Sequence, residues 1–387
     1  MIFTIWPRCS LARPTAYGLA LGMALSAAAL GCSSATPATL ADGTVWVVGS
    51  GQVQMLRLPD LSSLGQLRLA GPVVGSAEDA RRHRFDLLVG GPAPALVALA
   101  AVAPRLEARR RLGIEPAALV VDAAGQRAYL AGVAADGSGR VWAVAADSLQ
   151  VVARMTVAGQ PRALALSGDG QRLLLASDAT PSLRLIALAG WRRVATLALA
   201  QAPRQVVSLP YGHKAYVLCG DTVAVVDTDS GGLLCYLPVG PGAQRMLLKP
   251  DGGELYVSNA SGTVSAINTS TNEVSDTMAA GLGAGSMAVA QDGSVLYVGN
   301  AEAGTVSVIN LVNRKATAMV RVGERPDSLA LSPNGLLLLV ADAGSDDVAV
   351  VRSNQDPANP NTLVTLLPSP PAPGLVRAVA AAPGGAR

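Results

Sequence analysis

Three arginines, a glutamine and an aspartate occupy matching points of the sequence, and together they could bind an anion. Each follows the proline position of a V-G-x-x-P-like turn, and successive turns lie 40 to 50 residues apart. The residues at this point are Ala117, Arg162, Arg204, Gln244, Gly285, Asp327 and Arg377. Because a guanidinium group pairs bidentately with carboxylate or phosphate, the candidate ligand-binding residues are Arg162, Arg204, Gln244, Asp327 and Arg377. The alternative is that the arginines pair with Asp327, Glu115 or backbone carbonyls and only support the fold.

Side chains that commonly perform catalysis are scarce. The chain has two histidines, His83 and His213, each in a turn-like stretch. An isolated histidine in a turn is more often solvated than a metal ligand or a base. No Cys/His spacing suggests zinc, and neither a G-x-S-x-G nor a P-loop motif occurs. We therefore expect no catalytic residue, no metal ligand and no cofactor.

The elements that would position these candidate residues are repeated. Residues 255–274 read LYVSNASGTVSAINTSTNEV and residues 296–315 read LYVGNAEAGTVSVINLVNRK, an echo at a period of 41 to 42 residues. Each interval contains four short apolar segments, best seen as 254–259, 263–268, 273–280 and 286–290, separated by turn formers such as Pro250-Asp251-Gly252. Four antiparallel strands in each of many such repeats predict the blades of an all-β propeller. The candidate residues begin the innermost strands, so we expect them at the rim of one mouth of the central channel.

The repeat also carries a family resemblance. Its sequence of a Pro/Asp-Gly turn, LYV-x-N, G-T-V-S-V-I-N and T-x-x-N-x-V resembles the YVTN-type β-propeller repeat of bacterial and archaeal surface proteins. The resemblance is sharp over 246–350, recognisable from about 118, and faint over 40–117. Propellers that bind haem d1 or hydrolyse lactones use histidine or acidic clusters at the channel, and the sequence offers no such cluster. The recurring tryptophan motif of the eight-bladed quinone dehydrogenases is also missing.

Counting from turn to turn predicts eight blades. The first interval begins at residues 44–48 without an inner strand, and residues 374–385 supply an inner strand with no outer strands after it. We therefore expect the C-terminal strand to complete the N-terminal blade, which leaves the ring without a gap. Seven blades are the alternative if residues 84–112 do not form a full blade.

The N-terminus has the features of an export signal. Arg8 and Arg13 precede an apolar stretch that ends in Ala29-Leu30-Gly31-Cys32. This end resembles the lipobox of bacterial lipoproteins, which implies acylation of Cys32, and the serine after it favours the outer membrane. We expect a signal peptide over 1–31, a linker over 32–42 and one propeller domain over 43–387. An ordinary signal peptide is the alternative.

Two cysteines, Cys219 and Cys235, lie within the predicted propeller. One predicted strand separates them, and two ladder spacings of about 4.8 Å place their Cα atoms near 10 Å, too far for a disulfide. We expect two free, buried thiols.

These observations favour a binding function. We expect a non-catalytic, membrane-tethered binding or scaffold module of the bacterial cell envelope, monomeric, with an envelope protein or an anionic ligand as its partner. The alternative is a lactonase-like hydrolase or isomerase that acts at the channel mouth. The net charge of +3 is small, and the basic group within 81–111 lacks the interleaved aromatic side chains that stack bases, so nucleic acid is not an expected partner.

Overall fold

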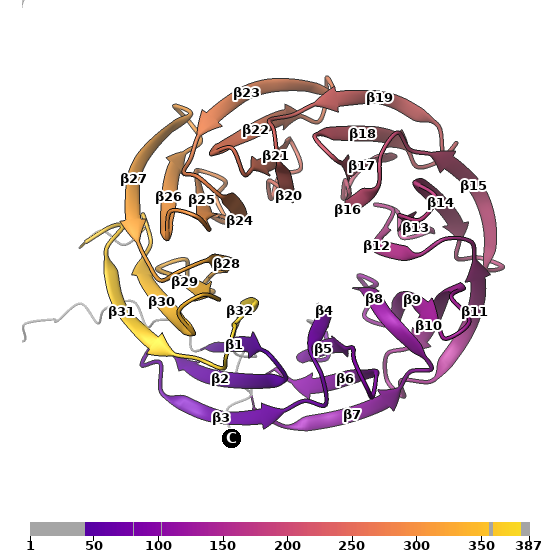
Figure 1. Ribbon diagram of the computed structural model, residues 1–387, viewed down its shortest axis with the longest axis horizontal. Coiled ribbons are helices and arrows are strands. Elements are labelled where there is room, and N and C mark those ends of the chain that lie inside the picture. The colour runs from indigo at the N-terminus through magenta and orange to yellow at the C-terminus, as the bar shows by residue number, and fades with distance from the viewer. Residues whose placement is uncertain (1–42, 80, 102, 356–358, 381–387) are drawn as a thin grey trace, which may run out of the picture. The chain divides into compact units, whose positions relative to one another are not determined.

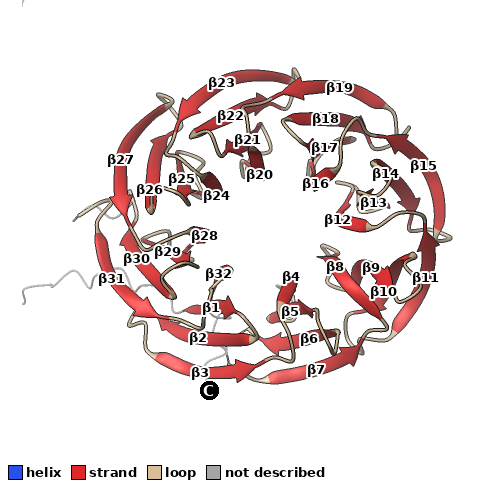
Figure 2. Ribbon diagram, viewed as in Figure 1, coloured by secondary structure: helices blue, strands red, loops and turns tan. Residues whose placement is uncertain are grey.

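The computed structural model describes residues 43–79, 81–101, 103–355 and 359–380. The chain divides into two units, residues 1–39 and residues 40–387. The described part of the second unit is a ring of strands around an open centre (Figure 1), and it contains strands but no helix (Figure 2). No helix in the described ranges is long and apolar enough to span a membrane.

The strands form eight antiparallel four-stranded sheets, which we number as blades 1 to 8. The innermost strands, in the order of blades 1 to 8, are β32 (Leu375–Ala380), β4 (Val73–Asp79), β8 (Ile114–Val121), β12 (Pro161–Leu166), β16 (Pro203–Ser208), β20 (Ala243–Leu248), β24 (Ala284–Val289) and β28 (Pro326–Leu331). The second strands are β1 (Gly43–Gly49), β5 (Arg84–Val89), β9 (Arg127–Ala134), β13 (Arg172–Ser177), β17 (Lys214–Cys219), β21 (Glu254–Asn259), β25 (Val295–Asn300) and β29 (Leu337–Asp342).

The outer half of each blade completes the sheet. The third strands are β2 (Gln52–Leu58), β6 (Ala95–Ala100), β10 (Gly139–Ala145), β14 (Ser182–Ala187), β18 (Thr222–Asp227), β22 (Thr263–Asn268), β26 (Thr305–Asn310) and β30 (Asp347–Arg352). The outermost strands are β3 (Ser63–Arg68), β7 (Leu106–Arg111), β11 (Val151–Val157), β15 (Arg192–Ala198), β19 (Leu233–Pro238), β23 (Glu273–Ala279), β27 (Lys315–Arg321) and β31 (Leu363–Pro368).

The ring closes as the sequence predicts. Strand β32 pairs antiparallel with β1, from Gly43 opposite Ala380 to Val48 opposite Leu375, so blade 1 combines the two ends of the described chain. The weak repeat contributes β5, β6 and β7 to blade 2, which has all four strands. The prediction of eight blades is therefore confirmed, and the seven-bladed alternative is wrong.

The core lies between neighbouring blades. The tyrosine of each LYV-like segment is fully buried against the next blade: Tyr216 packs with Leu255, Tyr256 with Leu296, and Tyr297 with Leu338. Such a side chain stabilises the fold by about 1.5–3 kcal/mol. The glycine of the preceding turn, Gly252 for example, has a positive φ of 74°, which other residues rarely adopt. Local turns and interblade packing thus specify the same repeat.

The two cysteines form no disulfide, as predicted. Cys219 ends β17 and is buried, and burial raises the pKa of its thiol to about 11. Cys235 lies in β19, two ladder steps away, and is only partly buried, so the expectation that both thiols are buried is wrong for Cys235. Its side chain stands on an outermost strand, which no further strand covers.

Blade 8 departs from a polar motif that blades 6 and 7 share. In blade 7 the Asn300 side chain accepts a hydrogen bond from Gly281 N at 3.0 Å and donates to Thr305 Oγ1 at 3.0 Å, and Asn259 donates to Thr263 in blade 6. Blade 8 has carboxyl groups at both of these positions, because Asp342 lies opposite Asp347.

The two carboxyl groups of blade 8 cannot both be charged at low cost. Asp342 is fully buried and accepts from Gly323 N at 3.1 Å. Burial raises the pKa of Asp342 from its ordinary 3.8 to about 8, and the Asp347 carboxyl raises it further against the opposing effect of Gly323. Asp342 therefore keeps its proton at neutral pH and takes the place of the amide donor of blades 6 and 7.

The substitution Asp342→Asn should stabilise the protein at neutral pH. The Asp342 carboxyl has a pKa near 3.8 in the unfolded chain and about 8 in the folded protein, so between these values only the folded state holds the proton. The free energy of unfolding of the natural protein therefore falls as pH rises through this window. An asparagine removes this pH dependence and restores a donor to Asp347, which should raise stability by about 1–3 kcal/mol near pH 8. Urea unfolding across the pH range measures the effect. Asn300→Asp is the matched control and should introduce the same downward slope; an unchanged slope in both variants would contradict the assignment.

Candidate functional site

A β-bulge places the predicted rim residues at one point of each inner strand. Seven of the eight innermost strands shift register near their first residues, and the residues left without a ladder partner include Ala117, Arg162, Arg204, Gln244, Gly285 and Asp327. Strand β4 adds Val74 at this point. A bulged residue leaves the ladder, and its side chain is re-aimed. Six of the seven aligned positions thus share one local geometry.

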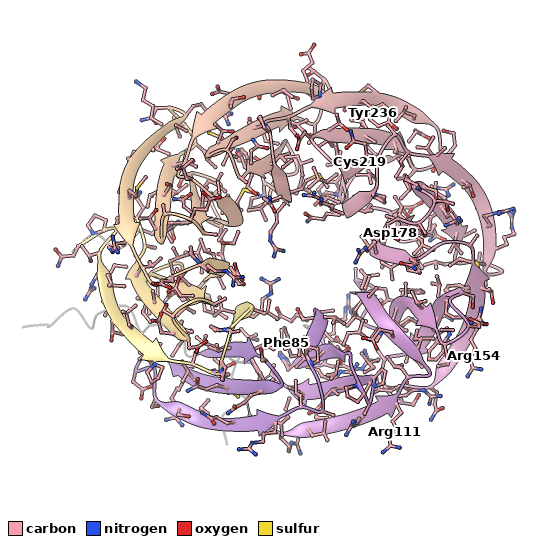
Figure 3. The ribbon with its side chains drawn as sticks, viewed as in Figure 1. Phe85, Arg111, Arg154, Asp178, Cys219 and Tyr236 are labelled. Carbon is pink, nitrogen blue, oxygen red and sulfur yellow. The ribbon has the colours of Figure 1, made fainter. Side chains whose placement is uncertain are left out.

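Arg162 and Arg204 line one cavity but are already engaged by the protein. They border a cavity of about 500 Å³ together with Gln201. Arg162 Nε lies 2.6 Å from Asp178 Oδ2, and Arg204 Nη1 donates to the carbonyl of Ala243 in the next blade at 2.8 Å. Figure 3 shows Asp178 at the inner edge of its blade. The alternative of internal pairing therefore describes both arginines, although the acid is Asp178.

Gln244 and Asp327 line a second, separate cavity of about 250 Å³, together with Glu302. Asp327 pairs with Arg325 at 3.2 Å. The five predicted residues therefore do not share one cavity, because the bulges distribute them around the ring instead of gathering them.

Arg377 lies deeper than the rim. Strand β32 has no bulge, and Arg377 pairs with Trp46, three residues before the end of β1. The spacing of the sequence turns predicts Arg377 at the rim, but β32 lacks the bulge of the other inner strands and pairs in a different register. Arg377 lines a third cavity, of about 370 Å³, which blades 1, 2 and 6 border. Solvent reaches its side chain, yet the enclosing protein lowers the pKa of Arg377, nearby Arg245 lowers it too, and Glu78 opposes both.

Arg245 is the residue that the sequence analysis missed. It lies in β20 directly after the bulge, is exposed, and lines both the cavity of Arg377 and the cavity of Gln244. Within the described residues, neither Arg245 nor Arg377 has a carboxylate within 4.0 Å. The only sequence feature that could have indicated Arg245 is that it directly follows Gln244. A bulge changes which of two adjacent side chains faces the centre of the ring.

The arrangement of Arg245 and Arg377 suits a negatively charged ligand. Blades 6 and 1 hold the two residues on well-separated parts of the ring, and their guanidinium groups nevertheless border the same cavity. Two like charges that converge without a salt bridge repel each other, and an anion between them would relieve this repulsion. Their planar donors match carboxylate or phosphate. We call this pair, with its cavity of about 370 Å³, the arginine site.

Few groups in the described part of the ring could perform catalysis. No three side chains of His, Cys, Asp or Glu lie close enough together there to hold a metal ion. His213 Nδ1 lies 2.9 Å from Asp229 Oδ2, in an exposed turn, and neither cavity of Arg245 is lined by a histidine, serine–histidine pair or cysteine. The arginine site therefore offers recognition of charge and no evident nucleophile.

Comparison with known proteins supports the fold alone. A scan of protein-family models gives no match, and a search of the curated proteins gives none either. Among solved structures, the chain is similar to the hydrazine synthase of Kuenenia stuttgartiensis, with 17% identity, 73% of this chain and 96% of that chain covered, and a TM-score of 0.59.

Two further structures cover more of the chain. The dihydro-heme d1 dehydrogenase NirN, in complex with DHE, shares 15% identity over 87% of this chain and 75% of that chain, with a TM-score of 0.71. Apo AztD from Citrobacter koseri shares 11% identity over 88% and 98%, with a TM-score of 0.68. At these identities the likeness shows a common propeller architecture. Proteins with this architecture have many different activities.

The internal partners of Arg162 and Arg204 predict small, separable effects on stability. Arg162→Ala should change the free energy of unfolding by less than about 1 kcal/mol, because its ion pair is exposed. Arg204→Ala should cost about 0.5–1.5 kcal/mol, since it removes a hydrogen bond that joins blade 5 to blade 6. Chemical denaturation measures both. A larger loss for Arg162 than for Arg204 would disagree with the contacts described.

Proposed function

We propose that the protein is a non-catalytic binding module of the bacterial cell envelope that holds an anionic ligand at the arginine site. One observation carries the proposal: Arg245 and Arg377 border one cavity with no salt-bridge partner among the described residues. A ligand carboxylate or phosphate placed between them gains charge-assisted hydrogen bonds of about 1.5–3 kcal/mol each. The anionic ligand of the earlier prediction remains, whereas its binding residues are revised to Arg245 and Arg377.

The proposed binding can be tested with citrate and inorganic phosphate as probes. Titration calorimetry on the full chain should show that Arg245→Ala/Arg377→Ala weakens binding of the preferred probe by about 100-fold, since each lost contact costs about tenfold. The matched control is Arg162→Ala/Arg204→Ala, which removes two rim arginines with internal partners and should change affinity by less than about threefold.

The outcome against the proposal is equally specific. If the control loses affinity and the Arg245/Arg377 variant keeps it, the ligand lies at the rim cavity of Arg162 and Arg204. If neither probe binds the natural protein, the arginine site does not bind small oxyanions of these two kinds, and the proposal fails.

The lining of the cavity of Gln244 also supports a second candidate function, that of an enzyme. Glu302 and Asp327 line one cavity with Arg245, which combines carboxyl groups and a guanidinium at the centre of the ring. A lactonase-like hydrolase or isomerase needs a general base and a group that stabilises negative charge, and these residue types could supply both. Turnover of simple lactones by the natural protein, lost in Asp327→Asn, would favour this second function over binding alone.

The envelope location rests on the sequence. Cys32 and the leader lie outside the described residues. The run Ala29-Leu30-Gly31-Cys32 and the YVTN-type resemblance support export and lipidation. Acyl chains on Cys32 would anchor the ring to a membrane, because each buried CH₂ contributes about 0.8 kcal/mol.

The lipid anchor has a direct test. Cys32→Ala should release the protein from the membrane fraction or leave its precursor uncleaved, because the thiol that accepts the lipid is gone. Fractionation of cells and metabolic labelling with a fatty-acid analogue measure this, with Cys9→Ala as the control that should remain in membranes. Normal retention and labelling of Cys32→Ala would contradict the lipoprotein assignment.

A further inference from the structure

A crevice between blades 3 and 4 contains a buried arginine without a counter-charge. The crevice has a volume of about 340 Å³, and its walls include Met155, Thr156 and Val157 of β11 and Arg184 and Arg193 of blade 4. Arg184 keeps only 7% of its surface exposed. This crevice shares no lining residue with the arginine site, so an inference from it is independent of the proposed function.

The position of Arg184 holds a small side chain in blades 6, 7 and 8. Counted from the start of the third strand, Arg184 of β14 corresponds to Ser265 in β22, Ser307 in β26 and Ala349 in β30. In blades 6 and 7 that serine accepts a hydrogen bond from the asparagine of the shared motif. Blade 4 has Ser177 in place of the asparagine, and Arg184 Nη1 donates to Ser177 Oγ at 3.0 Å. Blade 4 therefore has a charged arginine where blades 6 and 7 have an uncharged serine.

Nothing within the described residues neutralises Arg184. No carboxylate oxygen lies within 4.0 Å of it there, and its guanidinium donates a hydrogen bond to the uncharged Ser177 hydroxyl. Burial lowers the pKa of Arg184, and the like charge of Arg193 lowers it further, yet an arginine stays charged in proteins. Burying a charge without a partner is unfavourable, and a bound anion would offset this cost.

The walls of the crevice indicate the kind of anion. The Arg184 guanidinium is a planar fork that matches a carboxylate or phosphate group, and Arg193 adds a second positive charge. Met155 is partly buried and Val157 is buried, so one wall is apolar. A volume of about 340 Å³ lies at the small end of ligand sites.

We propose that the crevice between blades 3 and 4 is a second ligand site, which binds a small organic oxyanion whose charged head pairs with Arg184 and whose apolar part contacts Met155 and Val157. The head is a carboxylate or a phosphate ester, since both present the same oxygen geometry to a guanidinium. The site lies among the outer strands, away from the centre of the ring.

The test uses hexanoate, acetate and inorganic phosphate as probes of the full chain, in a buffer of low chloride because chloride competes for the same arginine. Hexanoate should raise the melting temperature of the natural protein at millimolar concentration, acetate less so because it lacks the apolar tail. A stronger effect of phosphate than of hexanoate would identify a phosphate head. No shift with any probe would overturn the proposal.

Three variants separate binding from folding. Arg184→Met keeps the apolar stem and removes the charge, so it should bind hexanoate at least tenfold more weakly and, without ligand, melt at the same or a higher temperature. Arg193→Ala should weaken binding less, and it keeps the test available if Arg184→Met does not fold. Arg192→Ala is the matched control. Arg192 is the exposed neighbour of Arg193 on β15 but does not line the crevice, so this variant should bind hexanoate normally.

The two ligand sites fail independently. Arg245→Ala/Arg377→Ala should leave the hexanoate response unchanged, whereas loss of that response would assign it to the arginine site. Undiminished hexanoate binding by Arg184→Met and Arg193→Ala would likewise overturn the second site. An equal loss for Arg192→Ala would show that binding depends only on surface charge, which also contradicts the proposal.

Discussion

The unsatisfied edge of a β-sheet is the constraint on which this structure depends. Each blade is a short sheet whose inner edge would attract another strand, and a ring turns that edge toward its centre, where β-bulges interrupt it in seven of the eight described inner strands. The pairing of β32 with β1 leaves blade 1 as complete as its neighbours. Outer edges stay open to solvent and carry charges, such as the arginines of β7 and β15. Figure 3 shows Arg111 and Arg154 at the outer margin of the ring.

Much of the fold was predictable because its determinants are local. Strands β21 and β22 begin and end where the repeat placed them, since turn glycines and alternating apolar residues act within a few positions. The site was predictable only in kind. Arg162 and Arg204 stand at the expected bulges, but their partners Asp178 and Ala243 come from pairings that no repeat period encodes. Arg245 was missed because a one-residue bulge changes which neighbour turns inward, and Arg377 was misplaced because β32 lacks that bulge.

The repeat also serves as its own reference, since eight copies of one unit show which side chains the fold requires. Asn259 and Asn300 each donate to a threonine hydroxyl in blades 6 and 7, and Asn300 also accepts from a glycine N–H. Blade 8 has Asp342 at the asparagine position and Asp347 at the threonine position. Blade 4 has Ser177 at the asparagine position and Arg184 at the position of the serine that accepts from the asparagine. A buried ionisable group costs free energy that the parent motif does not, so its presence calls for a compensating partner. In blade 8 the partner is a proton, and in blade 4 the structure leaves room for a ligand.

The joining of β32 to β1 ties the order of folding to the order of synthesis. Blades 2 to 8 are each contiguous in sequence, so their strands can pair as soon as they emerge, through contacts that are local and fast to form. Blade 1 is completed last, because β1, β2 and β3 are made first and their partner β32 is the last strand of the ring. Pairing β1 with β32 joins the two strands that lie farthest apart in the sequence. The ring can therefore close in this way only after β32 has been made. A circular permutant that begins at β4, with β32 linked to β1, would remove this dependence, because all eight described blades would then be contiguous in sequence.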